Sequence, residues 1–104
     1  MVKVDDWGDP QLIEAVLIWT GYRDRTTPCW DNSLLEQRFG ADATRWLTLL
    51  ESLADDFYAS NAKYDAPDLQ EMGVVAIRDF MQKHPDAPEE IAEAFAWCYT
   101  FDHR

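Results

Sequence analysis

The segment from Asp55 to Glu71 holds the residue types and spacing that best support a binding chemistry. It combines clustered acidic side chains with two tyrosines and a single lysine. Tyrosine is a preferred interface anchor because its ring is large and has few rotors, and surrounding carboxylates steer a basic partner. We therefore predict a partner-binding surface composed of Asp55, Asp56, Tyr58, Tyr64, Asp65, Asp68 and Glu71, extended by Glu89, Glu90 and Glu93 if the last two helices pack side by side.

Burial of Phe57 would turn Tyr58 and Asp55 away from the core face of their helix, which is what such a surface needs. A simpler interpretation stays open, in which Tyr58 and Tyr64 only cover the connecting loop with amphipathic rings. For Trp30, too, the side chain could either pack against the core or stand exposed for binding. In its polar loop we expect it to fold back onto the core rather than stand exposed as a binding residue.

No pattern typical of an enzyme or a metal site is found. The four glycines are far apart, so none forms a phosphate-binding loop. His84 and His103 lie outside the apolar stripes and are too far apart in sequence for a zinc motif, and no serine or cysteine has a neighbouring histidine base. Glu89 and Glu93 share a helix face, but solvated surface explains them. We predict a non-catalytic protein without a cofactor or metal.

The net charge of −11 limits the kinds of partner that the protein is expected to bind. Only nine basic residues are present and no two are adjacent, so direct binding to nucleic acid or to an anionic membrane is not expected. Twelve of the 20 acidic residues fall within residues 49–104, which makes the C-terminal half the acidic half. Such charge favours solubility, and it also matches a basic partner. High like charge predicts a monomer when the protein is free.

The sequence shows no apolar run long enough to span a membrane and no recognisable signal peptide. Cys29 and Cys98 stand alone, without a C-x-x-C motif, so reduced thiols are the expectation. Together these features predict a cytoplasmic protein.

Helical periodicity dominates the chain, and no alternating strand pattern interrupts it. Asp9-Pro10 begins the first expected helix, which Gly21 ends. A capping box at 33–36 opens the second, and Asp42 caps a third that runs to about Ala59. Its apolar stripe is the strongest in the sequence: Trp46, Leu49, Leu50, Leu53 and Phe57.

Two further helices complete the expected fold. The segment 61–66 is predicted as a linker, after which the Asp68-to-Glu71 spacing starts a fourth helix that ends at His84-Pro85. Its buried face is expected to include Leu69, and Gly73 to mark a close helix crossing. A capping box at 86–89 starts the fifth. We predict an all-α fold, a compact bundle of about five helices that forms one domain over residues 1–104, with residues 1–8 as an N-terminal arm.

A strongly acidic, single-domain helical chain with a corner of Tyr and Asp at 55–71 resembles the small bacterial immunity proteins, such as those paired with colicin nucleases and with contact-dependent or type VI secreted toxins. The resemblance is one of profile: the colicin-type motif has two adjacent tyrosines, whereas Tyr58 and Tyr64 are separated. It implies a cytoplasmic protein that neutralises one cognate toxin, often a basic nuclease, by binding it. Two alternatives remain open: a nucleic-acid mimic of the anti-restriction or anti-CRISPR type, and a small helical adaptor with an exposed apolar patch.

Overall fold

The computed structural model describes residues 7–22, 28 and 30–102, and every regular element within them is helical. The expected all-α compact fold is therefore confirmed, with a slightly different number of helices. Expectations for the arm at 1–6 and for Cys29 and His103 lie outside the described residues. The elements are α1 (Pro10–Thr20), α2 (Asn32–Phe39), a 3-10 turn (Gly40–Asp42), α3 (Ala43–Tyr58), α4 (Ala62–Asp65), α5 (Leu69–Lys83) and α6 (Glu89–Asp102).

The ends of α1 follow the expected signals. The Asp9 carboxylate accepts a hydrogen bond from the Gln11 backbone N–H at 2.9 Å, and Pro10 occupies the first helical position. Gly21 ends the helix with a left-handed φ of 79° that residues with a Cβ rarely adopt. The sequence signals and the local geometry therefore agree at both ends of this helix.

The expected start of the second helix is wrong by two residues. Asp31, rather than Ser33, caps α2, because the Asp31 carboxylate accepts from both the backbone N–H and the hydroxyl of Ser33. Asp42 does stand at the cap position of α3. Its side chain makes no capping bond there, since the 3-10 turn already leads directly into the helix.

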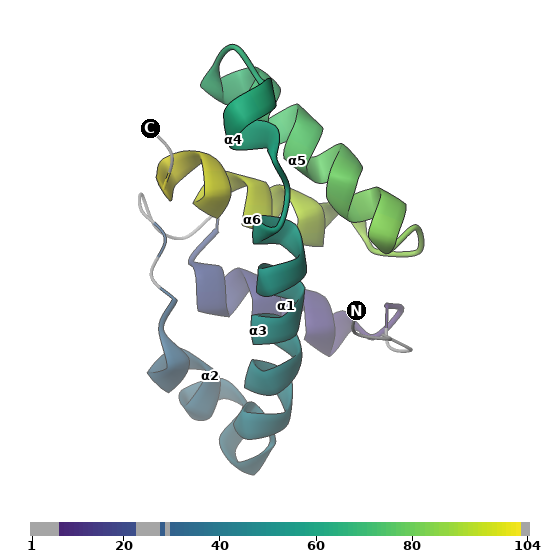
Figure 1. Ribbon diagram of the computed structural model, residues 1–104. Coiled ribbons are helices and arrows are strands. Elements are labelled where there is room, and N and C mark those ends of the chain that lie inside the picture. Colours follow the sequence, from purple (N-terminus) through teal and green to yellow (C-terminus); the bar gives the residue numbers. More distant parts are fainter. Residues whose placement is uncertain (1–6, 23–27, 29, 103–104) are drawn as a thin grey trace.

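The apolar stripe of α3 is buried as expected, with Leu49 alone only partly covered. Figure 1 shows α3 crossing α1 and α6, with α2 near one end of it and α4 at the other. Phe57, close to the C-terminal end of the stripe, contacts the rings of Phe80 on α5 and Phe95 on α6, with ring centroids 5.4 and 5.9 Å away. The core therefore joins α3, α5 and α6 around one phenyl ring.

Helices α5 and α6 form an antiparallel pair joined by residues 84–88. Gly73 faces Thr100, whose methyl carbon would lie 3.5 Å from a Cβ built at position 73. The expected close crossing is therefore present at Gly73. Leu69 lies one turn earlier, beside the groove between α5 and α6, and is 40% exposed. The expectation that Leu69 belongs to the buried face is wrong.

We predict that Gly73→Ala stabilises the protein. The new methyl group would make an ordinary van der Waals contact with Thr100, and alanine is favoured over glycine in a helix by about 1 kcal/mol. Urea denaturation should therefore show a free energy of unfolding higher by about 0.5–1 kcal/mol.

Gly40→Ala is the matched control, because Gly40 has a φ of +58°. The same methyl group at that position should lower the free energy of unfolding by about 1–3 kcal/mol. A destabilised Gly73→Ala protein would show that α5 and α6 pack more closely than described.

Candidate partner-binding site

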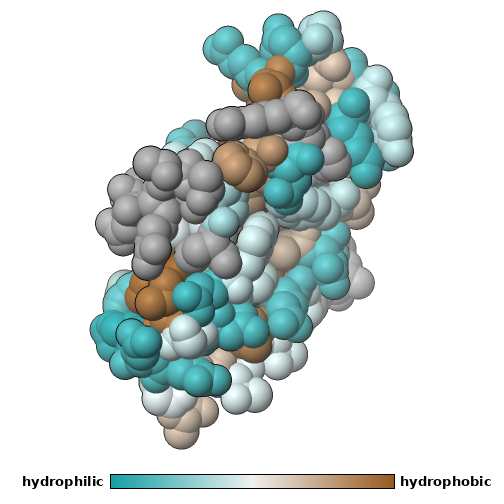
Figure 2. All heavy atoms as spheres, turned by 90° about the vertical axis from the view of Figure 1, so that its left-hand side faces the viewer, coloured by the Kyte–Doolittle hydropathy of each residue, from teal (hydrophilic) through white to brown (hydrophobic). Residues whose placement is uncertain are grey.

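The end of α4, the connection after it and the first two turns of α5 carry exposed side chains that we together call the acidic corner: Tyr64, Asp65, Asp68, Leu69, Glu71 and Val74. Within the described residues, the large apolar side chains that stand exposed are Tyr64 (78%), Leu69 (40%) and Val74 (56%), and all belong to this corner. Figure 2 shows hydrophilic residues beside apolar ones at the end of the molecule where Figure 1 places α4. Exposed apolar side chains and carboxylates thus occur close together in sequence, within residues 64–74.

Helix α4 has only four residues, and buried hydrogen bonds hold it in place. The hydroxyl of Tyr99, which is fully buried on α6, donates to the Ser60 carbonyl at 3.0 Å and accepts from the Lys63 backbone N–H at 3.1 Å. The Ser60 hydroxyl in turn donates to Asp79 on α5 at 2.6 Å. The position of Tyr64 therefore depends on contacts with both α5 and α6.

We predict that Tyr99→Phe loosens the acidic corner. The substitution leaves the buried Ser60 carbonyl and the Lys63 N–H without their partner, and a buried group left unsatisfied costs about 1–3 kcal/mol. Chemical denaturation should show that loss, and amide hydrogen exchange should quicken first at residues 60–66. Tyr64→Phe removes a hydroxyl from an exposed ring and serves as the control. Equal stability of the two variants would contradict this account of how α4 is held.

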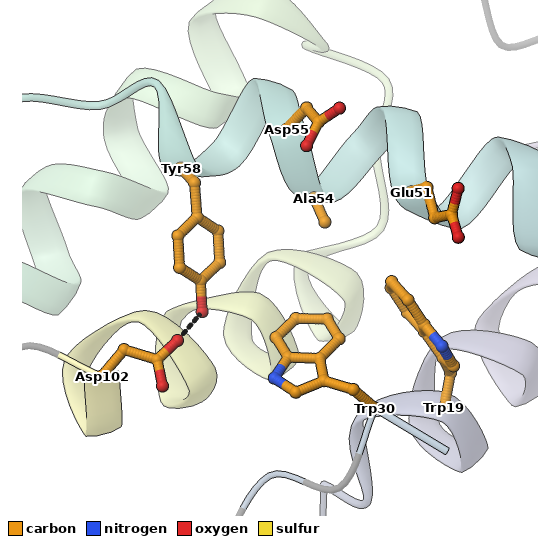
Figure 3. A pocket seen from close by; sticks show the side chains of 7 residues that line it. All are labelled: Trp19, Trp30, Glu51, Ala54, Asp55, Tyr58 and Asp102. Carbon is orange, nitrogen blue, oxygen red and sulfur yellow. Dashed lines mark hydrogen bonds between the residues drawn. The ribbon is translucent and has the colours of Figure 1, made fainter. Parts of the chain in front are cut away.

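Two of the predicted residues, Asp55 and Tyr58, line a separate cavity of about 360 Å³, which we call the acidic pocket. Figure 3 shows its walls, contributed by α1, α3, α6 and the segment before α2. Glu51, Ala54, Asp55 and Tyr58 follow one another at helical spacing and so share one face of α3, which lies beside the buried stripe. The lining residues are Trp19, Trp30, Glu51, Ala54, Asp55, Tyr58 and Asp102.

Trp30 forms one wall of the acidic pocket while packing against the core. Its ring makes an edge contact with Trp19, with centroids 4.6 Å apart, and stacks on Phe95 at 6.5 Å. The expectation that Trp30 folds back onto the core is confirmed. The residue adopts a left-handed φ of 48°, which is rare for a bulky side chain. Ring contacts on several sides stabilise this unusual conformation.

The Tyr58 hydroxyl donates to the Asp102 carboxylate at 2.7 Å, joining the ends of α3 and α6 (Figure 3). Partial burial raises the pKa of Tyr58 well above its usual value, and the hydrogen bond to Asp102 raises it further, because both favour the protonated phenol. Tyr58 therefore acts as a hydrogen-bond donor inside the pocket, and it fixes where the Asp102 carboxylate stands.

We predict that the Tyr58–Asp102 contact makes the fold sensitive to alkali. In the unfolded chain Tyr58 loses its proton near the ordinary tyrosine pKa of about 10. In the folded chain the hydroxyl keeps its proton at that pH, because its pKa is raised. The unfolded state then binds fewer protons, so this contribution to stability is complete below about pH 10 and is lost as the pH rises further. Urea denaturation between about pH 8 and 11 should show a steeper loss for the wild type than for Tyr58→Phe. Parallel curves would contradict the raised pKa.

Asp56 points away from both surfaces. Its carboxylate lies 2.9 Å from Nε2 of His84, and its backbone carbonyl accepts from the Lys83 ammonium. The His84 ring is 5% exposed and packs between Trp7 and Phe80. His84 lies outside the apolar stripes, at the cap position after α5, and its ring is nevertheless buried. Asp56 supplies the polar partner that makes this burial tolerable. Asp56 therefore has an internal structural contact.

Because α5 and α6 pack antiparallel, the three glutamates of α6 lie at different distances from the acidic corner. Glu89 and Glu90 lie in the first turn of α6, next to the end of α5 that is farthest from Asp68. Glu93 instead lines a shallow groove of about 410 Å³ between α5 and α6, which Leu69 also borders. The structure thus connects Glu93, but not Glu89 or Glu90, with the acidic corner.

Sequence analysis did not single out Glu51, Trp19 or Asp102 as site residues. The spacing of Glu51, Asp55 and Tyr58 was a usable signal for a shared face. Among the described residues, no group of three His, Cys, Asp or Glu side chains is arranged to hold a metal ion. In that same part of the chain, no helix has the length and apolar character needed to cross a bilayer.

Comparison with known proteins gives no relative. No protein-family model matches the chain, and no curated protein sequence or solved structure shows significant similarity to it.

Proposed function

We propose that this protein is a non-catalytic binding protein that neutralises a basic toxin or nuclease in a stoichiometric complex. One observation carries the proposal: the exposed large apolar side chains of the described residues all lie within residues 64–74, a short stretch that also presents Asp65, Asp68 and Glu71. Interfaces combine apolar anchors near their centre with a polar rim. The acidic corner has both components, and its charge complements a basic partner.

The two kinds of side chain have different tasks in this proposal. Tyr64 supplies the main anchor, because its ring is largely exposed and carries a hydroxyl at its tip. Lys63 lies over that ring at 5.2 Å, which orients it. The carboxylates of Asp65, Asp68 and Glu71 accelerate encounter with a basic surface, and this contribution weakens as salt screens it. The partner then also reaches the groove beside Leu69 and Glu93.

The mixed character of the corner favours this function over a nucleic-acid mimic. A mimic needs carboxylates in rows that replace phosphates, whereas here Leu69 and Val74 interrupt the acidic residues. An adaptor remains the alternative that shares the apolar patch, and inhibition of the partner separates it from an inhibitor. We assign the inhibitor to the cytoplasm, where it meets an incoming or newly made toxin.

We predict that a photo-crosslinking phenylalanine in place of Tyr64 captures one basic protein from lysate of the source cells, and that the same label at Glu36, an exposed residue outside the corner, does not. The captured protein, once purified, should lose its toxic or nuclease activity at one molar equivalent. Tyr64→Ala should lower its affinity by roughly 30-fold, the effect of an interface anchor worth about 2 kcal/mol.

Charge is tested by a pair of triple variants. The first triple variant should associate with the captured protein about 10-fold more slowly, or slower still, at low salt. It combines Asp65→Asn, Asp68→Asn and Glu71→Gln. Asparagine retains the ability of position 68 to cap α5. The control triple variant changes the net charge by the same amount at exposed positions outside the corner and should leave the association rate nearly unchanged. It combines Glu36→Gln, Asp42→Asn and Asp86→Asn. Equal effects of the two triples, or a captured protein that stays active when bound, would contradict the proposal.

A further inference from the structure

We infer that the acidic pocket is a receptor for one arginine side chain of the protein's basic partner. The inference rests on the proposed function and deepens it, since it assigns a particular contact to a surface separate from the acidic corner. The pocket differs from an ordinary acidic surface because aromatic rings form its walls and carboxylates stand at its edge.

Carboxylates from two helices stand at the edge of the pocket. Glu51 and Asp55 extend from one face of α3, and Asp102 stands at the end of α6 (Figure 3). No Lys or Arg lies among the described residues that line the cavity. Within the described part of the chain, Glu51 and Asp55 also have no ion-pair partner of their own. The described lining of the pocket therefore carries negative charge, which complements a cation.

The walls favour a planar cation. The Trp30 ring stands at 77° to Trp19 and at 66° to Tyr58, so the three aromatic groups that line this open pocket have different orientations. A guanidinium group stacks on aromatic faces and at the same time donates in a fixed fork to carboxylates. An ammonium group is a strongly hydrated point charge and gains less from such walls. The geometry thus points to arginine rather than lysine.

A metal ion is the other cation to consider, and the ligand spacing disfavours it. Divalent ions need several oxygen ligands around one point, whereas no such group of three exists in the described residues. The neutral hydroxyl of Tyr58 already donates a hydrogen bond to the Asp102 carboxylate. Asp102 is therefore oriented to share its charge with a larger, delocalised cation.

The test uses the intact protein and acetyl-arginine amide as the probe, and does not require the partner. The indole N–H signals of Trp19 and Trp30 are followed by NMR, with acetyl-lysine amide and acetyl-citrulline amide as comparison ligands. Arginine should shift both signals saturably. The lysine compound should bind several-fold more weakly, and the uncharged citrulline compound should give no saturable shift.

Paired variants locate the binding. Glu51→Gln with Asp55→Asn should weaken arginine binding at least 10-fold, whereas Glu36→Gln with Asp86→Asn, equal in charge change and outside the pocket, should leave it unchanged. Absence of saturable shifts, or equal binding of citrulline, would overturn the inference. Binding that emerges only after Arg23→Gln and Arg25→Gln would assign the pocket to the chain's own arginines and overturn it as well. These outcomes are independent of the acidic-corner variants, so the pocket and the proposed function fail separately.

Discussion

The burial of Phe57 is the constraint on which both candidate surfaces depend. Its ring meets aromatic rings from α5 and α6 and is fully enclosed. Once Phe57 points inward, helical geometry fixes the directions of its neighbours. Asp55 and Tyr58 then face the acidic pocket, and Asp56 faces His84. The burial of one phenyl ring therefore decides which neighbouring carboxylate lines the pocket and which one contacts the buried His84.

A protein with this excess of acidic residues must place them where their mutual repulsion is low. Some of the carboxylates do structural work within the chain. Asp9, Asp31 and Asp68 cap helices, where the positive end of the helix dipole favours negative charge. Asp56 and Asp79 accept hydrogen bonds from buried groups. Asp68 also belongs to the acidic corner, so a carboxylate that stabilises a helix can remain part of an exposed surface.

Local signals predicted much of this fold because they act within a few residues. The cap at Asp9, the stop at Gly21 and the stripe on α3 needed only neighbours along the helix. Helix α4 escaped prediction because four residues carry no periodicity, and the contacts of Tyr99 that hold it come from α6. The burial of His84 and the pocket around Trp30 depend on residues far apart in sequence. No single-sequence pattern encodes such contacts. Tyr64, Asp65, Asp68 and Glu71 are exposed, as a binding surface requires, whereas the exposure of Leu69 and the pocket around Trp30 were not predicted.

The edge contact between Trp19 and Trp30 has an optical consequence. The centroids of the two indole rings are 4.6 Å apart and the rings are nearly perpendicular. At this distance and fixed orientation, the electronic transitions of the two rings couple. Coupled transitions of this kind give a circular-dichroism signal that isolated tryptophans lack. Because Trp19 belongs to α1 and Trp30 lies beyond it, immediately before α2, the signal requires both segments to be docked. The protein therefore contains an intrinsic spectroscopic reporter for the packing of its N-terminal half.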